Sequence, residues 1–88
     1  VDCLTLWLSN IMAASRDVET EIETLISTLS GCRAPVIMVS NEVGLGIVPD
    51  NALARTFRDE AGRMNQRLAE AADRVIFVAA GLPLIMKG

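Results

Sequence analysis

The sequence predicts an α/β fold with a parallel sheet, because two short apolar segments flank one long amphipathic helix. Residues 34–40 and 75–80 have the length and composition of strands, and residues 51–73 carry apolar side chains at helical spacing. A strand, a helix and a second strand in succession form a βαβ unit, whose right-handed crossover makes the two strands parallel. Ligands of open α/β sheets bind at the carboxyl edge, so we expect chemistry in residues 40–49.

Length and composition are those of one small domain. The chain has 88 residues, 51% of them hydrophobic, so a packed core is expected. A domain of this size buries only about 60 to 65% of its unfolded surface, and a parallel sheet needs helices on both faces. With a net charge of −3 and two Phe and one Trp as its aromatic residues, the chain offers neither a phosphate-neutralising surface nor a base-stacking platform. We expect no nucleic-acid partner.

Two helices are predicted in the first third of the chain. The apolar stretch 4–14 is interrupted by polar residues and is shorter than the roughly 20 residues of a membrane span, so we expect a buried helix and no span. The stretch from about Arg16 to Ser30 has apolar residues at helical spacing. Ser15 or Asp17 can cap its start and Gly31 suits its end.

The expected strands and the long helix follow in order. Pro35 is tolerable only at the start of the strand 34–40, which should be buried on both faces. Asp50 is the expected cap of the helix over residues 51–73. After the strand 75–80, residues 81–87 should return as an edge strand, because Pro83 does not suit the middle of a sheet. The expected buried stripe of the long helix consists of Leu53, Phe57, Ala61, Met64, Leu68 and Ala72.

The loop after the first strand carries two polar residues and two glycines. Gly44 and Gly46 allow backbone conformations or close approaches that a Cβ atom would block. The loop lacks GxxxxGK[ST] and also the third glycine of a dinucleotide fingerprint, so phosphate cradling by the loop itself is not expected. Instead we expect Asn41 and Glu42 to orient a substrate hydroxyl, a water or a metal beside an apolar pocket wall. The alternative is a glycine turn whose apolar residues join the core.

A second group of candidates lies at the start of the chain. Asp2 ends an apolar strand, from which a carboxylate can reach a magnesium ion held by nucleotide phosphates. The alternative role for Asp2 is the cap of the helix that starts at Leu4. Thr5 and Ser9 could offer hydroxyls to phosphate oxygens, or they could hydrogen bond locally within the helix.

Four arginines of the long helix could bind phosphate or carboxylate groups in a bidentate manner. Acidic residues are interspersed among them, so an ion-paired, solvated face is the alternative, and Arg55 and Arg58 are singled out because they lie nearest the loop. Cys3 and Cys32 have no CxxC spacing and the chain contains no His, which argues against a metal site or a disulfide framework. The same absence of an activating base gives no support to nucleophilic catalysis.

Four stretches of the sequence together carry a family resemblance: VDCLTLWL at 1–8, VSNEVGLGIVP at 39–49, RTFRDEAGRMNQ at 55–66 and GLP at 81–83. They closely resemble the second half of the bifunctional adenosylcobinamide kinase/adenosylcobinamide-phosphate guanylyltransferase family of cobalamin biosynthesis. The likeness covers essentially all 88 residues. The uninterrupted NEVGxGIVP segment is its most specific part.

The resemblance implies a parallel-sheet P-loop NTPase (RecA-like) fold and a cytoplasmic bacterial enzyme that assembles as a homotrimer. In this family ATP or GTP phosphorylates the aminopropanol hydroxyl of adenosylcobinamide. The enzyme then takes GMP from GTP onto a histidine and passes it to the phosphorylated corrinoid, giving adenosyl-GDP-cobinamide. By position, Asp2 would be the acidic residue near Mg²⁺, Thr5 would lie beside the guanine nucleotide, and Asn41 and Glu42 would belong to the active-site loop.

Two parts of the family pattern lie upstream of the stretches seen here. The Walker A loop and the guanylylated histidine of the family do not occur in residues 1–88. We therefore expect residues 1–88 to be the C-terminal half of a single P-loop kinase/guanylyltransferase domain, inactive alone and paired with a missing N-terminal half. The alternatives are a non-catalytic folding or oligomerisation module and half of another small P-loop kinase.

Overall fold

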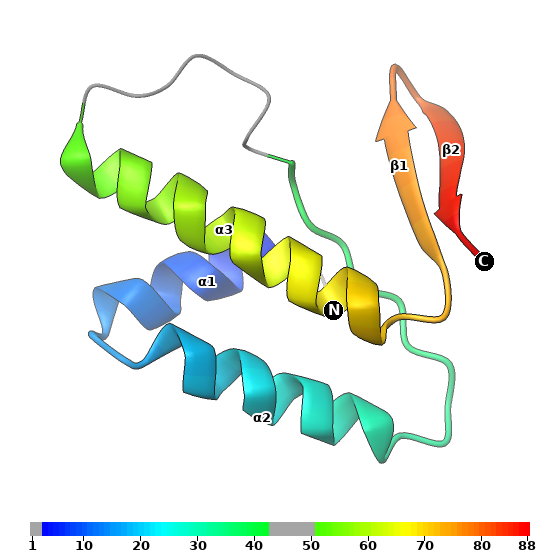
Figure 1. Cartoon of the computed structure of the whole chain (residues 1–88), viewed down its shortest axis with the longest axis horizontal. Coiled ribbons are helices and arrows are strands. Elements are labelled where there is room, and N and C mark those ends of the chain that lie inside the picture. The colour runs from blue at the N-terminus through cyan, green and yellow to red at the C-terminus, as the bar shows by residue number, and fades with distance from the viewer. Residues whose placement is uncertain (1–2, 43–50) are drawn as a thin grey trace.

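The computed structural model describes residues 3–42 and 51–88, which form three helices followed by a β-hairpin (Figure 1). The helices pack against one another. The hairpin lies beyond the C-terminal end of the last helix (Figure 1). The elements in chain order are α1 (Leu4–Ala13), α2 (Val18–Ser30), α3 (Ala52–Ala71), β1 (Val75–Ala79) and β2 (Leu82–Lys87).

The first two helices lie where their sequence patterns predict them. α1 begins after Cys3, whose backbone is extended with φ −119° and ψ 135°. α2 begins after Asp17, and the Thr20 hydroxyl donates a hydrogen bond of 2.8 Å to the Asp17 carboxylate. Glu19 and Glu21 in the first turn of α2 interact favourably with the positive end of the helix dipole.

The cap of α3 is Asn51, one residue later than the predicted Asp50. The Asn51 side-chain oxygen accepts hydrogen bonds from the amides of Leu53 and Ala54 at 2.8 and 3.2 Å, which satisfies two of the amides that a helix start leaves without partners. Asp50 lies outside the described residues. α3 is the longest helix, yet none of the helices over residues 3–42 and 51–88 combines the length and apolarity that crossing a bilayer requires.

The hydrophobic core is built by all three helices. Met38 from the segment after α2 and Phe57 of α3 pack against its edge as half-buried side chains. The prediction of Leu53 as a core residue is wrong, because its side chain lies in the first turn of α3, is 72% exposed and borders an open groove against α1. The buried residues of this cluster are Leu4, Leu8, Ile22, Ala61, Met64 and Leu68.

The predicted buried strand over residues 34–40 is not formed. Only Val39 takes part in an isolated bridge, and Ile37 is 79% exposed. The parallel pairing expected with residues 75–80 is also absent from the described residues, in which β1 pairs with β2 alone and in antiparallel fashion. A strand buried on both faces needs neighbouring strands on its edges, and the described residues supply none along this segment. The parallel P-loop sheet therefore stays a prediction.

The return of residues 81–87 as an edge strand is confirmed. β2 pairs with β1 so that Ala79 faces Leu82 and Val78 faces Pro83. The two turn residues, Ala80 and Gly81, both have positive φ values, 52° and 77°. Positive φ at both central positions is the condition for a type I′ turn, whose twist matches that of the paired strands.

Candidate active site at the start of α1

Three polar side chains meet at the N-terminal end of α1. The Asn41 side-chain amide donates a hydrogen bond of 3.1 Å to the Thr5 hydroxyl and lies 3.8 Å from the Cys3 sulfur. The Cys3 sulfur is in turn 2.7 Å from the Thr5 hydroxyl oxygen. Thr5 is only 6% exposed, so the amide of Asn41 gives a buried hydroxyl its partner from a distant part of the chain.

Backbone and side-chain contacts hold residues 39–41 against the start of α1. The Leu4 amide donates a 2.7 Å hydrogen bond to the Val39 carbonyl, which satisfies one of the first amides of the helix. From the side of α3, the Asn65 amide group donates to the Asn41 carbonyl at 3.2 Å, and its oxygen accepts from the Ser40 hydroxyl at 2.6 Å. The segment is therefore held by α1 and α3 together.

The structure brings some of the predicted site residues together. Thr5 and Asn41 are hydrogen-bonded, and Glu42 follows Asn41 directly and is exposed. Asp2 lies outside the described residues, so its predicted place near Mg²⁺ is not tested, but its alternative role as the cap of α1 is not what the structure shows. The position of the cap of α1 is taken by Cys3, which makes no side-chain capping hydrogen bond.

The glycine loop also lies outside the described residues, with Gly44 and Gly46 inside the gap at 43–50. Both interpretations of this loop, the pocket wall and the glycine turn, therefore stay predictions. In the described part of the chain, no group of three or more His, Cys, Asp or Glu side chains is arranged to hold a metal ion. A magnesium ion held mainly by nucleotide phosphates needs only one or two carboxylates from the protein.

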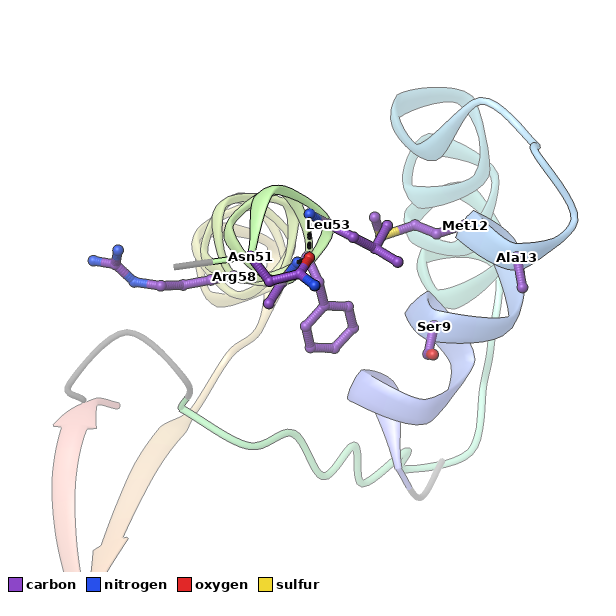
Figure 2. Close-up of a pocket in the computed structure, with 8 residues that line it drawn as sticks. Ser9, Met12, Ala13, Asn51, Leu53 and Arg58 are labelled. Atoms are coloured by element: carbon purple, nitrogen blue, oxygen red, sulfur yellow. Dashed lines mark hydrogen bonds between the residues drawn. The ribbon is translucent and has the colours of Figure 1, made fainter. Parts of the chain in front are cut away.

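A groove of about 650 Å³ separates the end of α1 from the start of α3. Figure 2 shows Met12 of α1 opposite Leu53 of α3, while the Arg58 side chain extends away from the space between them. The groove is thus lined mainly by apolar atoms, and the Arg58 guanidinium is directed elsewhere. Its lining residues are Ser9, Met12, Ala13, Asn51, Leu53, Ala54, Phe57 and Arg58.

The two arginines near the loop lie in the first half of α3 and do not join the Thr5 and Asn41 contacts. Arg55 is exposed and Arg58 is half-buried. Ion pairing does occur further along the helix, where Arg67 contacts Glu19 of α2 at 2.8 Å and Arg63 pairs with Glu60. The ion-paired helix face is therefore confirmed for the second half of α3, and phosphate binding by Arg55 and Arg58 stays a prediction.

Asn65 is the residue of this network that the sequence reasoning did not assign. A weak signal was present, because asparagine is a poor helix former and Asn65 lies in the interior of the predicted helix. Its side chain is half-buried and makes both of the contacts described above. A polar residue in such a position needs a partner, but the sequence does not say which one.

Known proteins similar to this chain act in cobalamin biosynthesis. It is 46% identical over 90 aligned residues to the bifunctional adenosylcobalamin biosynthesis protein CobP of Pseudomonas aeruginosa, with 100% of the chain and 52% of that protein covered. The bifunctional adenosylcobalamin biosynthesis proteins CobU of Salmonella typhimurium and Escherichia coli are 42% and 38% identical over 102 aligned residues, each match covering 99% of the chain and 56% of the relative.

The chain spans about half the length of these curated relatives. The matched part includes the start of α1, the segment 39–42 and α3, because essentially the whole chain is aligned. A model of the CobU family, described as cobinamide kinase / cobinamide phosphate guanyltransferase, matches residues 1–86. The chain therefore belongs to the CobU family of cobinamide kinases and cobinamide phosphate guanyltransferases.

Proposed function

We propose that this chain is the C-terminal part of an enzyme that phosphorylates adenosylcobinamide with ATP or GTP and then transfers GMP from GTP to adenosylcobinamide phosphate. The product is adenosyl-GDP-cobinamide. The observation that carries the proposal is the hydrogen bond between Asn41 and Thr5, because it joins two of the stretches on which the family resemblance rests. Membership of the CobU family supports the same function.

Thr5 and the start of α1 are proposed to lie beside the bound nucleotide. The N-terminal end of a helix presents backbone amides and the positive end of the helix dipole, and both favour phosphate groups. The Thr5 hydroxyl accepts from Asn41 and lies 2.7 Å from the Cys3 sulfur, and it is proposed to turn its hydrogen from Cys3 to a phosphate oxygen when the nucleotide binds. The hydrogen bond between Asn41 and Thr5 would therefore be kept when the phosphates bind.

Magnesium is proposed to bind on the side of Asp2. Mg²⁺ prefers oxygen ligands and is commonly held by one or two carboxylates together with substrate phosphates. When bound, it would neutralise charge on the phosphates during transfer. Asn41 and Glu42 are then proposed to orient the acceptor group of the corrinoid, and Arg55 and Arg58 to contact phosphate groups from α3.

The remaining parts of the proposal concern polypeptide upstream of Val1 in the parent protein. It is proposed to supply the Walker A loop and the guanylylated histidine, and to complete a parallel P-loop sheet. Assembly as a homotrimer in the bacterial cytoplasm belongs to the same proposal. The activity is assigned to the parent protein, because neither the Walker A sequence nor a histidine occurs in residues 1–88.

The test is an assay of the full-length parent protein with adenosylcobinamide, Mg²⁺ and either ATP or GTP. We expect phosphorylation of adenosylcobinamide and, with GTP, transfer of GMP to the product. Phosphorylation of a different small acceptor, with no reaction of adenosylcobinamide, would identify another small P-loop kinase instead.

Variants of the parent protein test the residue roles. We expect Asp2→Ala to lower the rate about 100-fold, as removal of a charge-stabilising group at a reaction centre does, and to raise the Mg²⁺ concentration needed for half-maximal activity. Thr24→Ala is the matched control, because Thr24 lies exposed on α2 and its hydroxyl donates to the Thr20 carbonyl of the same helix. A wild-type rate and Mg²⁺ requirement in Asp2→Ala would contradict the assigned role.

A second candidate function is a non-catalytic folding or oligomerisation module. It is favoured by the apolar side chains that the hairpin and the segment 34–40 expose, among them Ile37 at 79%, Leu82 at 70% and Ile85 at 66%. Exposed apolar surface of this kind commonly marks an interaction site. Sedimentation of the 88-residue chain tests it, since self-association is expected for such a module and a monomer at all concentrations contradicts it.

A further inference from the structure

We propose that Asn65 is a positioning residue that holds the Asn41–Glu42 segment in its working place. The inference rests on the proposed function, in which this segment orients the acceptor. Asn65 lies in α3, 24 and 25 positions along the chain from the two residues that it contacts. It would act through Asn41 and Glu42, without touching the substrate.

The Asn65 side chain holds two successive residues with its two polar atoms. Its oxygen accepts from the Ser40 hydroxyl at 2.6 Å, and its amide nitrogen donates to the Asn41 carbonyl at 3.2 Å. A side chain that must accept one hydrogen bond and donate another in this way needs an amide, because an ionised carboxylate only accepts. This requirement explains why an asparagine lies in the interior of α3.

The contacts of Asn65 complete those made by α1. On the other side of the segment, the Leu4 amide donates to the Val39 carbonyl and the Asn41 amide donates to Thr5. Residues 39–41 are thus held from two helices, and the Asn65 side chain supplies two hydrogen bonds from α3. Loss of the Asn65 side chain would remove two of the hydrogen bonds that hold Ser40 and Asn41, and the resulting backbone shift would be passed on to Glu42, the next residue.

The expected consequence is a loss of rate with little loss of nucleotide binding. Displacement of a reacting group by about 1 Å can cost about 100-fold in rate, whereas a nucleotide bound at the start of α1 would keep its own contacts. In the full-length parent protein we expect Asn65→Ala to lower kcat by about 10- to 100-fold and to change the KM for the nucleotide by less than about twofold. Gln66→Ala is the matched control, because it removes an amide side chain from the adjacent, exposed position.

The variant Asn65→Asp adds a readout that a purely structural role would not move. The introduced carboxyl has an ordinary pKa of about 3.9, so at neutral pH it is ionised and cannot donate to the Asn41 carbonyl. As the pH falls toward this pKa, the carboxyl gains a proton and can donate. We therefore expect the ratio of the kcat of Asn65→Asp to that of the wild type to rise as the pH is lowered from about 6 to about 4, where the carboxyl becomes about half protonated, with no such rise for Asn65→Ala.

Hydrogen–deuterium exchange of the same parent protein tests the positioning without the reaction. We expect peptides that contain residues 39–42 to exchange faster in Asn65→Ala than in the wild type, and to be unchanged in Gln66→Ala. Unchanged exchange or unchanged kcat in Asn65→Ala overturns the inference while the proposed function stands. If the wild-type protein does not react with adenosylcobinamide, the proposed function fails, and the exchange measurement alone decides whether Asn65 holds the segment.

Discussion

The amide group of Asn41 donates a 3.1 Å hydrogen bond to the hydroxyl of Thr5, and the two residues are 36 positions apart in the chain. Thr5 sits in the first turn of α1 and is buried, whereas Asn41 follows the segment that packs along the helix start. This contact brings the first stretch of the family resemblance to the loop stretch. It therefore links two stretches of the family resemblance within the candidate site.

Removal of the Thr5 hydroxyl should destabilise the protein through this contact. Thr5→Val keeps the shape of the side chain but leaves the Asn41 amide with only the Cys3 sulfur, 3.8 Å away, as an acceptor, so we expect the free energy of unfolding to fall by about 1 kcal/mol. Urea denaturation measures the change. Thr24→Val is the control, since the Thr24 hydroxyl is exposed and donates to the carbonyl of the preceding turn. Equal effects in both variants would show that the Asn41 contact contributes nothing.

The core assignment in α3 can be tested with two truncations. Met64 is fully buried, so Met64→Ala should lower the free energy of unfolding by about 2 to 5 kcal/mol through lost burial and a cavity. Leu53 is 72% exposed, so Leu53→Ala should change the free energy of unfolding by less than about 0.5 kcal/mol. Thermal or denaturant unfolding of both variants measures the difference. A large loss in Leu53→Ala would restore the sequence-based placement of this residue in the core.

Two glycines should respond in opposite directions to the same substitution. Gly81 has φ 77° in the hairpin turn, and a Cβ atom there meets no neighbour within 4 Å, so Gly81→Ala should destabilise by about 1 kcal/mol through backbone strain alone. Gly62 lies within α3 with equally open space for a Cβ, so Gly62→Ala should stabilise by about 0.5 to 1 kcal/mol. Calorimetric melting of both variants checks the signs, and equal signs would contradict the turn geometry.

Lys87 should tie the hairpin to the end of α3. Its ammonium group donates hydrogen bonds of 3.0 Å to the Ala69 and Glu70 carbonyls, which are among the carbonyls that a helix end leaves unpaired. Lys87→Met should lower the free energy of unfolding by about 0.5 to 1 kcal/mol, and Lys87→Arg, which keeps donors at the end of the side chain, should lose less. Amide hydrogen exchange in the last turn of α3 should be faster in Lys87→Met than in the wild type. Equal exchange rates would show that Lys87 does not stabilise the end of α3.

Local patterns located the elements that depend on local interactions. The helix repeat of 3.6 residues places α1 and α2 at their observed positions, because this signal acts within a few residues of the chain, although neither Cys3 nor Asp17 makes a side-chain capping hydrogen bond. The return of the chain after Gly81 was also predictable, since Pro83 restricts β2 to an edge. The cap at Asn51 was misjudged by one residue, because Asp50 and Asn51 are both good capping residues and sequence alone does not choose between them.

Non-local interactions account for the wrong predictions. Apolar composition indicates a buried strand over residues 34–40, but a strand exists only where another backbone pairs with it, and in the described structure only Val39 of this segment takes part in a bridge. Leu53 matches the apolar stripe of α3. Whether a side chain in the first turn of this helix is buried, however, depends on the distance between that turn and α1. Periodicity carries no information about that distance.

The sequence by itself determined where the helices and the hairpin form and to which family the chain belongs, because these follow from short-range patterns and from stretches of matching residues. Only the tertiary structure decided that Asn41 meets Thr5 and that Asn65 holds Ser40 and Asn41. The physical reason is that each of these contacts joins residues 24 to 36 positions apart. Such distances are closed by the packing of the three helices and not by any local preference of the chain.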